Sequence, residues 1–113
     1  MNDTICLSIP AEPVYISVVR LTASSLASNL GFDIEEVEDI RVCVSEACNN
    51  LMNDRSQISL RFTVKESALE IDVDGFSKPS TEQDKLGYLI MSSLMDVVEE
   101  TADGIHMIKA KEQ

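Results

Sequence analysis

Basic residues are scarce in this sequence. The chain has 9 lysines and arginines against 20 aspartates and glutamates, which gives a formal net charge of −11 at pH 7. A field of that sign repels the phosphates of DNA and RNA and the headgroups of an anionic membrane. The composition therefore argues against direct binding of nucleic acids or membranes, and it favours a protein partner or a magnesium-bound nucleotide.

Cysteine and long apolar runs are also in short supply. The three cysteines, Cys6, Cys43 and Cys48, are odd in number and form no CxxC pair, so we expect reduced thiols rather than a disulfide framework or a zinc site. No uninterrupted apolar run approaches the ~20 residues of a membrane helix. Residues 1–10 lack the basic start and long apolar run of a signal peptide. These absences predict a cytoplasmic protein.

The sequence does contain enough apolar material for one core. Its 113 residues are 44% hydrophobic, and the mean hydropathy of +0.01 is ordinary for a globular protein. A chain of this length buries about two-thirds of its unfolded surface, which suffices for one core but not for two. We expect residues 1–113 to form a single domain.

The clearest helical pattern runs from Phe32 to Asp54. Asp33 is the predicted N-cap, with Glu36 as its capping-box partner. Apolar residues recur every three or four positions and form one continuous stripe: Val37, Ile40, Val44, Ala47 and Leu51. This helix is expected to bury that stripe and to organise the rest of the chain.

Glu46 and Asn50 lie one turn apart on another face of the same predicted helix. One interpretation is that both side chains are simply solvated. The other is that Asn50 supplies a carbonyl oxygen to Mg²⁺, a hard cation that binds few protein ligands together with phosphate oxygens. Glu46 would then polarise a hydroxyl or a water that attacks a phosphoryl group. The pair alone does not discriminate between these interpretations.

The remaining pattern predicts two more helices and five strands. Apolar residues alternate with polar ones in the predicted strands: 5–9, 58–64, 69–73, 97–101 and 105–110. Helices are predicted at 13–30 and 87–95, the second apolar nearly all round and hence largely buried, with a loop at 76–85. Asp103-Gly104 signals a two-residue hairpin turn. Because strands and helices do not alternate strictly, we predict an α+β two-layer sandwich: a mixed, mostly antiparallel sheet with three helices on one face.

Asp74, Gly75 and Gly87 are weaker candidates for function. Gly75 could merely end a strand, and Gly87 could merely permit a tight entry into the last helix. Alternatively, an aspartate at a strand end could accept a hydrogen bond from the amino group of adenine. A glycine at a helix N-terminus could let backbone N–H groups approach a phosphate.

The order of these features resembles a known family. The run from Asp39 to Asn50, which includes V-S-E-A-C-N-N, precedes a hairpin that ends in D-G and a last run, Gly87 to Val98. This series is similar to the anti-sigma-factor serine/threonine kinases, which have the GHKL or histidine-kinase-like ATPase fold, and it covers nearly the whole chain. The resemblance implies that Glu46 is the catalytic base, that Asn50 holds Mg²⁺, and that ATP contacts Asp74, Gly75 and Gly87.

The resemblance also implies partners. Proteins of that family phosphorylate a serine on a STAS-type anti-anti-sigma protein and sequester a sigma factor, usually as homodimers. The first helix lies on the partner-binding side there, so Arg20 could anchor an acidic or carbonyl-rich partner surface. A solvated Arg20 is the alternative.

The sequence departs from the family pattern at its glycine boxes. The D-x-G-x-G box is reduced here to the run from Asp72 to Ser77, and Lys85 replaces the first glycine of the later G-x-G. The predicted loop 76–85 is shorter than the usual ATP lid. Two hypotheses therefore remain open: an Mg-ATP-dependent serine kinase, or a catalytically inactive protein-binding module on the same scaffold.

Overall fold

Five strands and three α-helices make up the fold of the computed structural model, which describes residues 2–52, 56–76 and 80–111. A short 3-10 turn, Pro13–Tyr15, leads into the first helix. The elements follow the chain in this order: β1 (Asp3–Pro10), α1 (Ile16–Leu30), α2 (Ile34–Asn49), β2 (Gln57–Val64), β3 (Ala68–Asp74), α3 (Glu82–Leu94), β4 (Val97–Glu100) and β5 (Gly104–Ala110).

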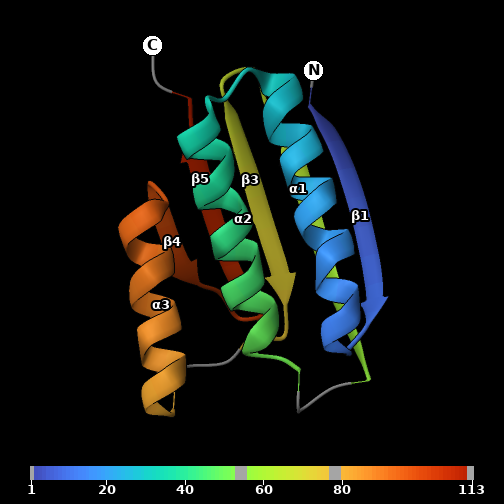
Figure 1. The fold of residues 1–113 in the computed structure, drawn as a ribbon, viewed down its shortest axis with the longest axis vertical. Helices are drawn as coiled ribbons and strands as arrows, with labels where there is room; N and C mark the ends of the chain where they lie inside the picture. Colours follow the sequence, from blue (N-terminus) through green and yellow to red (C-terminus); the bar gives the residue numbers. More distant parts are fainter. Residues whose placement is uncertain (1, 53–55, 77–79, 112–113) are drawn as a thin grey trace.

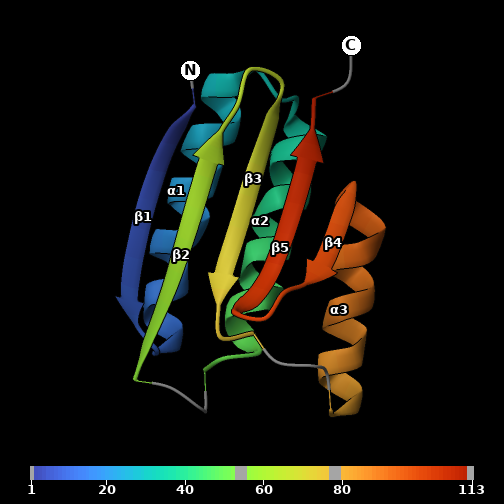
Figure 2. The same ribbon diagram turned by 180° about the vertical axis from the view of Figure 1, so that it is seen from behind.

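The strands form one sheet in the order β1-β2-β3-β5-β4, and each of these pairings is antiparallel. All three helices cover the same face of this sheet (Figure 1), and the opposite face is open (Figure 2). The predicted α+β two-layer sandwich with three helices on one face is therefore confirmed. In the described part of the chain, no helix is long and apolar enough to cross a membrane.

The central helix α2 forms as its sequence predicts. Asp33 Oδ1 accepts a hydrogen bond from the Glu36 N–H at 2.8 Å, and Glu36 Oε1 accepts one from the Asp33 N–H at 2.9 Å, which confirms the capping box. Just before it, Gly31 ends α1 in a left-handed conformation, with φ 89°. A side chain there would be strained, so the glycine makes the tight α1–α2 connection possible.

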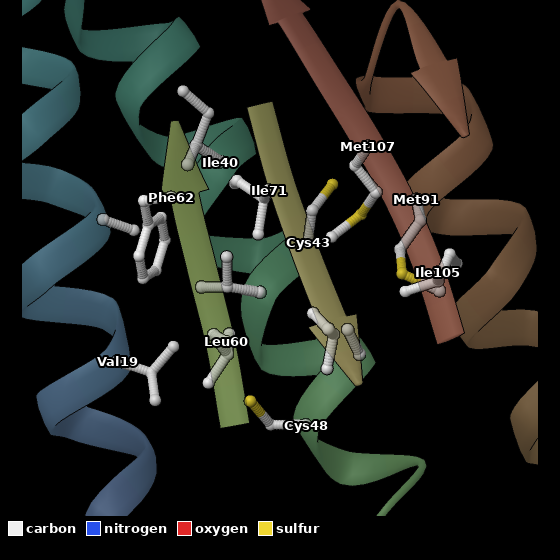
Figure 3. Packing of buried hydrophobic residues seen from close by; sticks show 14 of the residues in the cluster. Val19, Ile40, Cys43, Cys48, Leu60, Phe62, Ile71, Met91, Ile105 and Met107 are labelled. Atoms are coloured by element: carbon white, nitrogen blue, oxygen red, sulfur yellow. The ribbon is translucent and has the colours of Figure 1, made fainter. Parts of the chain in front are cut away.

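The core lies between α1, α2 and the sheet. Ile40 of α2 points towards the sheet near Ile71 of β3, and Val19 of α1 lies over the side of β2 (Figure 3). Ile40, Ile71 and Val19 are all completely buried. The apolar stripe of α2 therefore does what the sequence predicts: it fixes the helix on the sheet and leaves its other faces for polar residues.

Helix α3 differs from its prediction in length and in burial. It begins at Glu82, inside the predicted loop, because Thr81 Oγ1 accepts a hydrogen bond from the Asp84 N–H at 3.0 Å and caps it. It is not largely buried either: Leu86 and Leu89 are 57% and 61% exposed. The helix lies at the edge of the helix layer beside α2 (Figure 1), so only one side of it can pack.

The hairpin of β4 and β5 also differs in detail from its prediction. Gly104 is the first residue of β5 rather than half of a two-residue turn, and the Thr101 N–H donates to its carbonyl oxygen at 2.8 Å. A Cβ atom on Gly104 would lie 2.0 Å from the carbonyl oxygen of Val73. Glycine at this position therefore permits the close pairing of β5 with β3.

Candidate functional site

The C-terminal end of α2 presents Asn50 in an unusual environment. Asn50 follows the last helical residue, and its N–H donates to the carbonyl oxygen of Glu46 at 3.3 Å. Its side-chain Oδ1 is buried and has no hydrogen-bond partner among the residues described. A buried polar atom without a partner costs about 1–3 kcal/mol, so its presence calls for an explanation such as a ligand.

Glu46, one turn earlier, lies where α2 meets α3. A Cβ atom on Gly87 would come within 2.7 Å of Glu46 Oε2. Because glycine has no Cβ, the carboxylate can approach the backbone of α3 closely. The structure thus brings Glu46 and Gly87 together and leaves Asn50 one turn along the same helix.

The sequence suggested that the last helix begins at Gly87, but in the structure it begins at Glu82. The Lys85 N–H already donates to the carbonyl oxygen of Thr81 at 3.0 Å, so regular helical bonding is established two residues before Gly87. The free N–H groups of a helix belong to its first turn. The expectation that Gly87 stands at the N-terminus of a helix is therefore wrong. The glycine instead makes room for Glu46.

The side chain of Asp74 faces away from the helix layer that carries Glu46 and Asn50. Along β3, Ile71 and Val73 are buried against the helices, so Asp72 and Asp74 point to the open face of the sheet. There Asp72 Oδ1 lies 2.7 Å from His106 Nδ1 on β5. Asp74 thus lies on the face of the sheet opposite to the helices that carry Glu46 and Asn50 (Figure 1).

Gly75 has a structural reason for its identity. Its φ of 82° is left-handed, and its N–H donates to the carbonyl oxygen of Asp103 at 2.6 Å. Both features join the end of β3 to the turn before β5. The strand-ending role considered for Gly75 is the one that the geometry supports.

Two cysteines, Cys43 and Cys48, are buried along α2. Burial raises the pKa of Cys48 to about 12, and burial together with the negative charge of Asp39 raises the pKa of Cys43 to about 12. Both thiols therefore stay protonated and weakly nucleophilic at neutral pH. Cys6, on β1, is exposed.

The oxygen atoms near Asn50 suit Mg²⁺ only if most of its other ligands come with a nucleotide. Within the described ranges there is no group of three or more His, Cys, Asp or Glu side chains that could hold a metal ion. Mg²⁺ commonly binds through one or two protein oxygens together with phosphate oxygens and water. The buried Oδ1 of Asn50 suits that mode, in which most of the ligands come with the nucleotide.

Comparisons with known proteins identify relatives of this chain. Residues 9–109 match the sequence profile described as histidine kinase-like ATPase domain. The chain is 38% identical over 117 residues to the serine-protein kinase RsbW of Bacillus velezensis, covering 95% of this chain and 72% of that protein. It is 34% identical to RsbW of Bacillus subtilis with the same coverage, and 33% identical over 123 residues to RsbW of Bacillus pumilus, covering 96% and 76%.

This chain belongs to the histidine kinase-like ATPase domain family. The aligned stretches of 117 and 123 residues are longer than the 113 residues of the chain, so these family members carry residues that it lacks. Glu46, Asn50 and Gly87 all lie within the matched range. Within this family member, Glu46 and Gly87 are in contact, whereas Asp74 lies on the other face of the sheet.

Ser45 is a residue of this region that sequence reasoning missed. Among the described residues it is the only polar side chain that is buried, at 7% exposure. Its Oγ accepts a hydrogen bond from Arg20 Nε at 2.7 Å and donates one to the Arg41 carbonyl oxygen at 2.8 Å. A small polar residue between apolar neighbours on a helix is a weak sequence signal, because its partner here is 25 residues away.

Proposed function

We propose that this chain is a cytoplasmic regulatory protein of the anti-sigma type. It binds a sigma factor or a STAS-type anti-anti-sigma protein, and it phosphorylates a serine of the latter with Mg-ATP. Similarity to serine-protein kinases over 95% of the chain supports the proposal. The observation that carries it is the buried, unpartnered Oδ1 of Asn50, one turn from Glu46.

Each residue has one task in this proposal. Asn50 binds Mg²⁺ through Oδ1, and Glu46 orients the serine hydroxyl of the partner and accepts its proton. Gly87 leaves the space that the Glu46 carboxylate occupies. When bound, Mg-ATP supplies the phosphoryl group and neutralises the charge that develops on transfer.

The outer face of α1 supports the protein-binding part of the proposal. Leu21 of α1 is 68% exposed and Val18 is half-exposed, and Val14, in the 3-10 turn that leads into α1, is 70% exposed. An apolar stripe in solvent on an acidic protein marks a surface for protein contact. We assign this stripe to partner binding and homodimer formation.

A second candidate function is a catalytically inactive binding module on the same scaffold. The observation that favours it is the erosion of the nucleotide contacts. Gly87 offers no helix-terminal N–H group, and Asp74 faces the open side of the sheet. In this alternative Asn50 and Glu46 remain without a nucleotide, and regulation rests on protein binding alone.

Nucleotide binding separates the two candidates. Mg-ATP and Mg-ADP are titrated into the purified protein by calorimetry, and thermal unfolding is followed in parallel. A ligand that binds only the folded state raises its stability by RT ln(1 + [L]/Kd). Heat of binding and a raised Tm support the kinase. If both signals are absent at millimolar nucleotide, the kinase is eliminated and the inactive module is left.

Variants assign the roles. Asn50→Ala should remove the magnesium dependence of nucleotide binding, whereas Asn29→Ala, at an exposed position of α1, should leave it intact. Glu46→Gln should retain binding and lose phosphoryl transfer to the STAS protein. Equal magnesium dependence in Asn50→Ala and the unchanged protein would remove Asn50 from the proposed site.

A further inference from the structure

The first turn of α3 contains one acidic residue that is set apart from its neighbours. Within residues 82–85, Asp84 is half-buried and the other three residues are exposed. Asp84 lies three residues before Gly87 and seven before Met91, the two buried residues of this helix, so all three lie on one side of it. The packed side of α3 therefore continues one turn beyond its buried residues and ends in a carboxylate.

Asp84 lies at the same level as Asn50 on the neighbouring helix. Figure 1 shows α2 and α3 side by side, with α2 running downwards and α3 running upwards, so the two helices are antiparallel. Their register is given by Glu46 and Gly87, because a Cβ atom on Gly87 would lie 2.7 Å from Glu46 Oε2. In an antiparallel pair, one turn forward on α2 lies beside one turn back on α3. That step leads from Glu46 to Asn50 and from Gly87 to Asp84.

The Asp84 carboxylate has no partner in the described part of the chain. Its N–H donates to Thr81 Oγ1 at 3.0 Å, but its side chain forms no hydrogen bond or ion pair there. The acid at the same position of α2 behaves differently: Glu36 closes a capping box by accepting the Asp33 N–H at 2.9 Å. Asp84 does not bond back to its N-cap in this way, so its oxygens remain available to a ligand.

The two unpartnered oxygen donors select the kind of ligand. Asn50 Oδ1 is buried without a hydrogen-bond partner among the described residues, and Asp84 adds a negative charge at the same level. A phosphate group alone would be repelled by that charge. A hard divalent cation suits both oxygens, because Mg²⁺ commonly takes one or two protein oxygens, carboxylates included, and completes its shell with water and phosphate.

We propose that Asp84 is a second protein ligand of the magnesium ion, across from Asn50. This inference deepens the proposed function and rests on it for the role of Asn50. The ion joins the first turn of α3 to the end of α2, while Glu46 stays beside Gly87 as the proposed base. Without the ion, the charge of Asp84 repels the phosphates of a nucleotide, so nucleotide binding is expected to depend strictly on Mg²⁺.

Metal binding in the absence of nucleotide tests this ligand directly. Mn²⁺ is titrated into the purified protein at about 0.15 M ionic strength, where exposed charges are screened, and the free ion is measured by electron paramagnetic resonance. Asp84→Asn and Asn50→Ala should each weaken Mn²⁺ binding at least about tenfold, since even the outer-shell partners of a metal contribute 10–100-fold. Glu82→Gln, which removes an equal charge from the same turn of α3, is the matched control and should bind Mn²⁺ normally.

Nucleotide affinity gives a second measurement, in which the two expected changes have opposite signs. In Asp84→Asn, Mg-ATP should bind more weakly because the ion has lost a ligand. ATP in the presence of EDTA should bind more tightly because a repelling charge is gone. Tighter binding both with and without Mg²⁺ would overturn the inference, since Asp84 would then only repel the phosphates.

Failure of the inference and failure of the proposed function give different results. If the unchanged protein binds no Mn²⁺ at millimolar ion, or if Asp84→Asn binds it equally well, Asp84 is not a ligand, whereas binding of Mg-ATP still upholds the proposed function. If Mn²⁺ binding requires both Asp84 and Asn50 but no nucleotide binds, the metal site stands and the kinase falls.

Discussion

Helices α2 and α3 carry the two halves of the candidate site, and they are anchored very differently. Helix α2 has a reciprocal capping box at its start and six buried residues along its length. Helix α3 has two buried residues, Gly87 and Met91, and exposes Leu86 and Leu89. The Asn50 and Glu46 side of the site thus stands on a rigid support, whereas the Gly87 side lies on a helix at the edge of the layer.

Few interactions hold the edge helix. Besides the packing of Met91 and of the partly buried Tyr88 and Leu94, Nζ of Lys109 on β5 donates to the Leu94 carbonyl oxygen at 2.6 Å and lies 3.4 Å from Asp39 on α2. A cation near the last carbonyl groups of a helix also interacts favourably with the negative end of the helix dipole. The α2 half of the site is therefore preorganised, and α3 is the less firmly held half.

The largest expected effect compares one core residue from each helix. Ile40→Ala should lower the free energy of unfolding by about 3–4 kcal/mol, because Ile40 is fully buried between α2 and the sheet. Met91→Ala should cost less, about 2–3 kcal/mol, because the edge of the layer can close around a smaller side chain. Urea denaturation followed by circular dichroism measures both values.

Native-state hydrogen exchange shows which elements each variant destabilises. In Ile40→Ala, protection should fall across the whole protein with the global stability. In Met91→Ala, the amides of α3 should lose more protection than those of α2 and β3, as expected for local opening. Equal losses in both helices of the Met91→Ala variant would contradict the proposed difference in anchoring.

A second effect depends on pH and reports on the interior of α2. The pKa values of Cys43 and Cys48 are raised to about 12 in the folded protein, from a usual value of 9.0. Above pH 9 the unfolded chain loses these protons first, so it binds fewer protons than the folded state and stability must fall as pH rises towards 12. The slope is about 1.4 kcal/mol per pH unit for each thiol at most.

Cysteine variants isolate that slope from other titrations. The free energy of unfolding of Cys43→Ala and Cys48→Ala should depend less on pH between 9 and 11 than that of the unchanged protein. Cys6→Ser, at an exposed position on β1, is the control and should keep the full dependence. In the native protein at pH 8, a thiol reagent should modify Cys6 alone. Rapid labelling of Cys43 would show that α2 opens more readily than its packing implies.

The contrast between the helices also explains what the sequence could predict. The strands, the capping box and the inward stripe of α2 were predicted correctly, because each is a local pattern read over a few residues. The burial of α3 was not predicted correctly. Its apolar residues surround the helix, and only the fold decides which of them are covered by other elements. The separation of Asp74 from Asn50 depends on strand register, and the Ser45–Arg20 bond depends on how α1 packs on α2.

The smallest expected effect concerns the exposed side of α3. Leu86→Ser and Leu89→Ser should each change the free energy of unfolding by less than about 0.5 kcal/mol, because these leucines are 57% and 61% exposed in the folded protein. Met91→Ser, on the buried side of the same helix, is the matched comparison and should be strongly destabilising. A loss of 2 kcal/mol or more in either leucine variant would mean that the outer side of α3 is covered in solution. The edge helix would then be as firmly packed as α2, and the difference in anchoring between the two halves of the site would disappear.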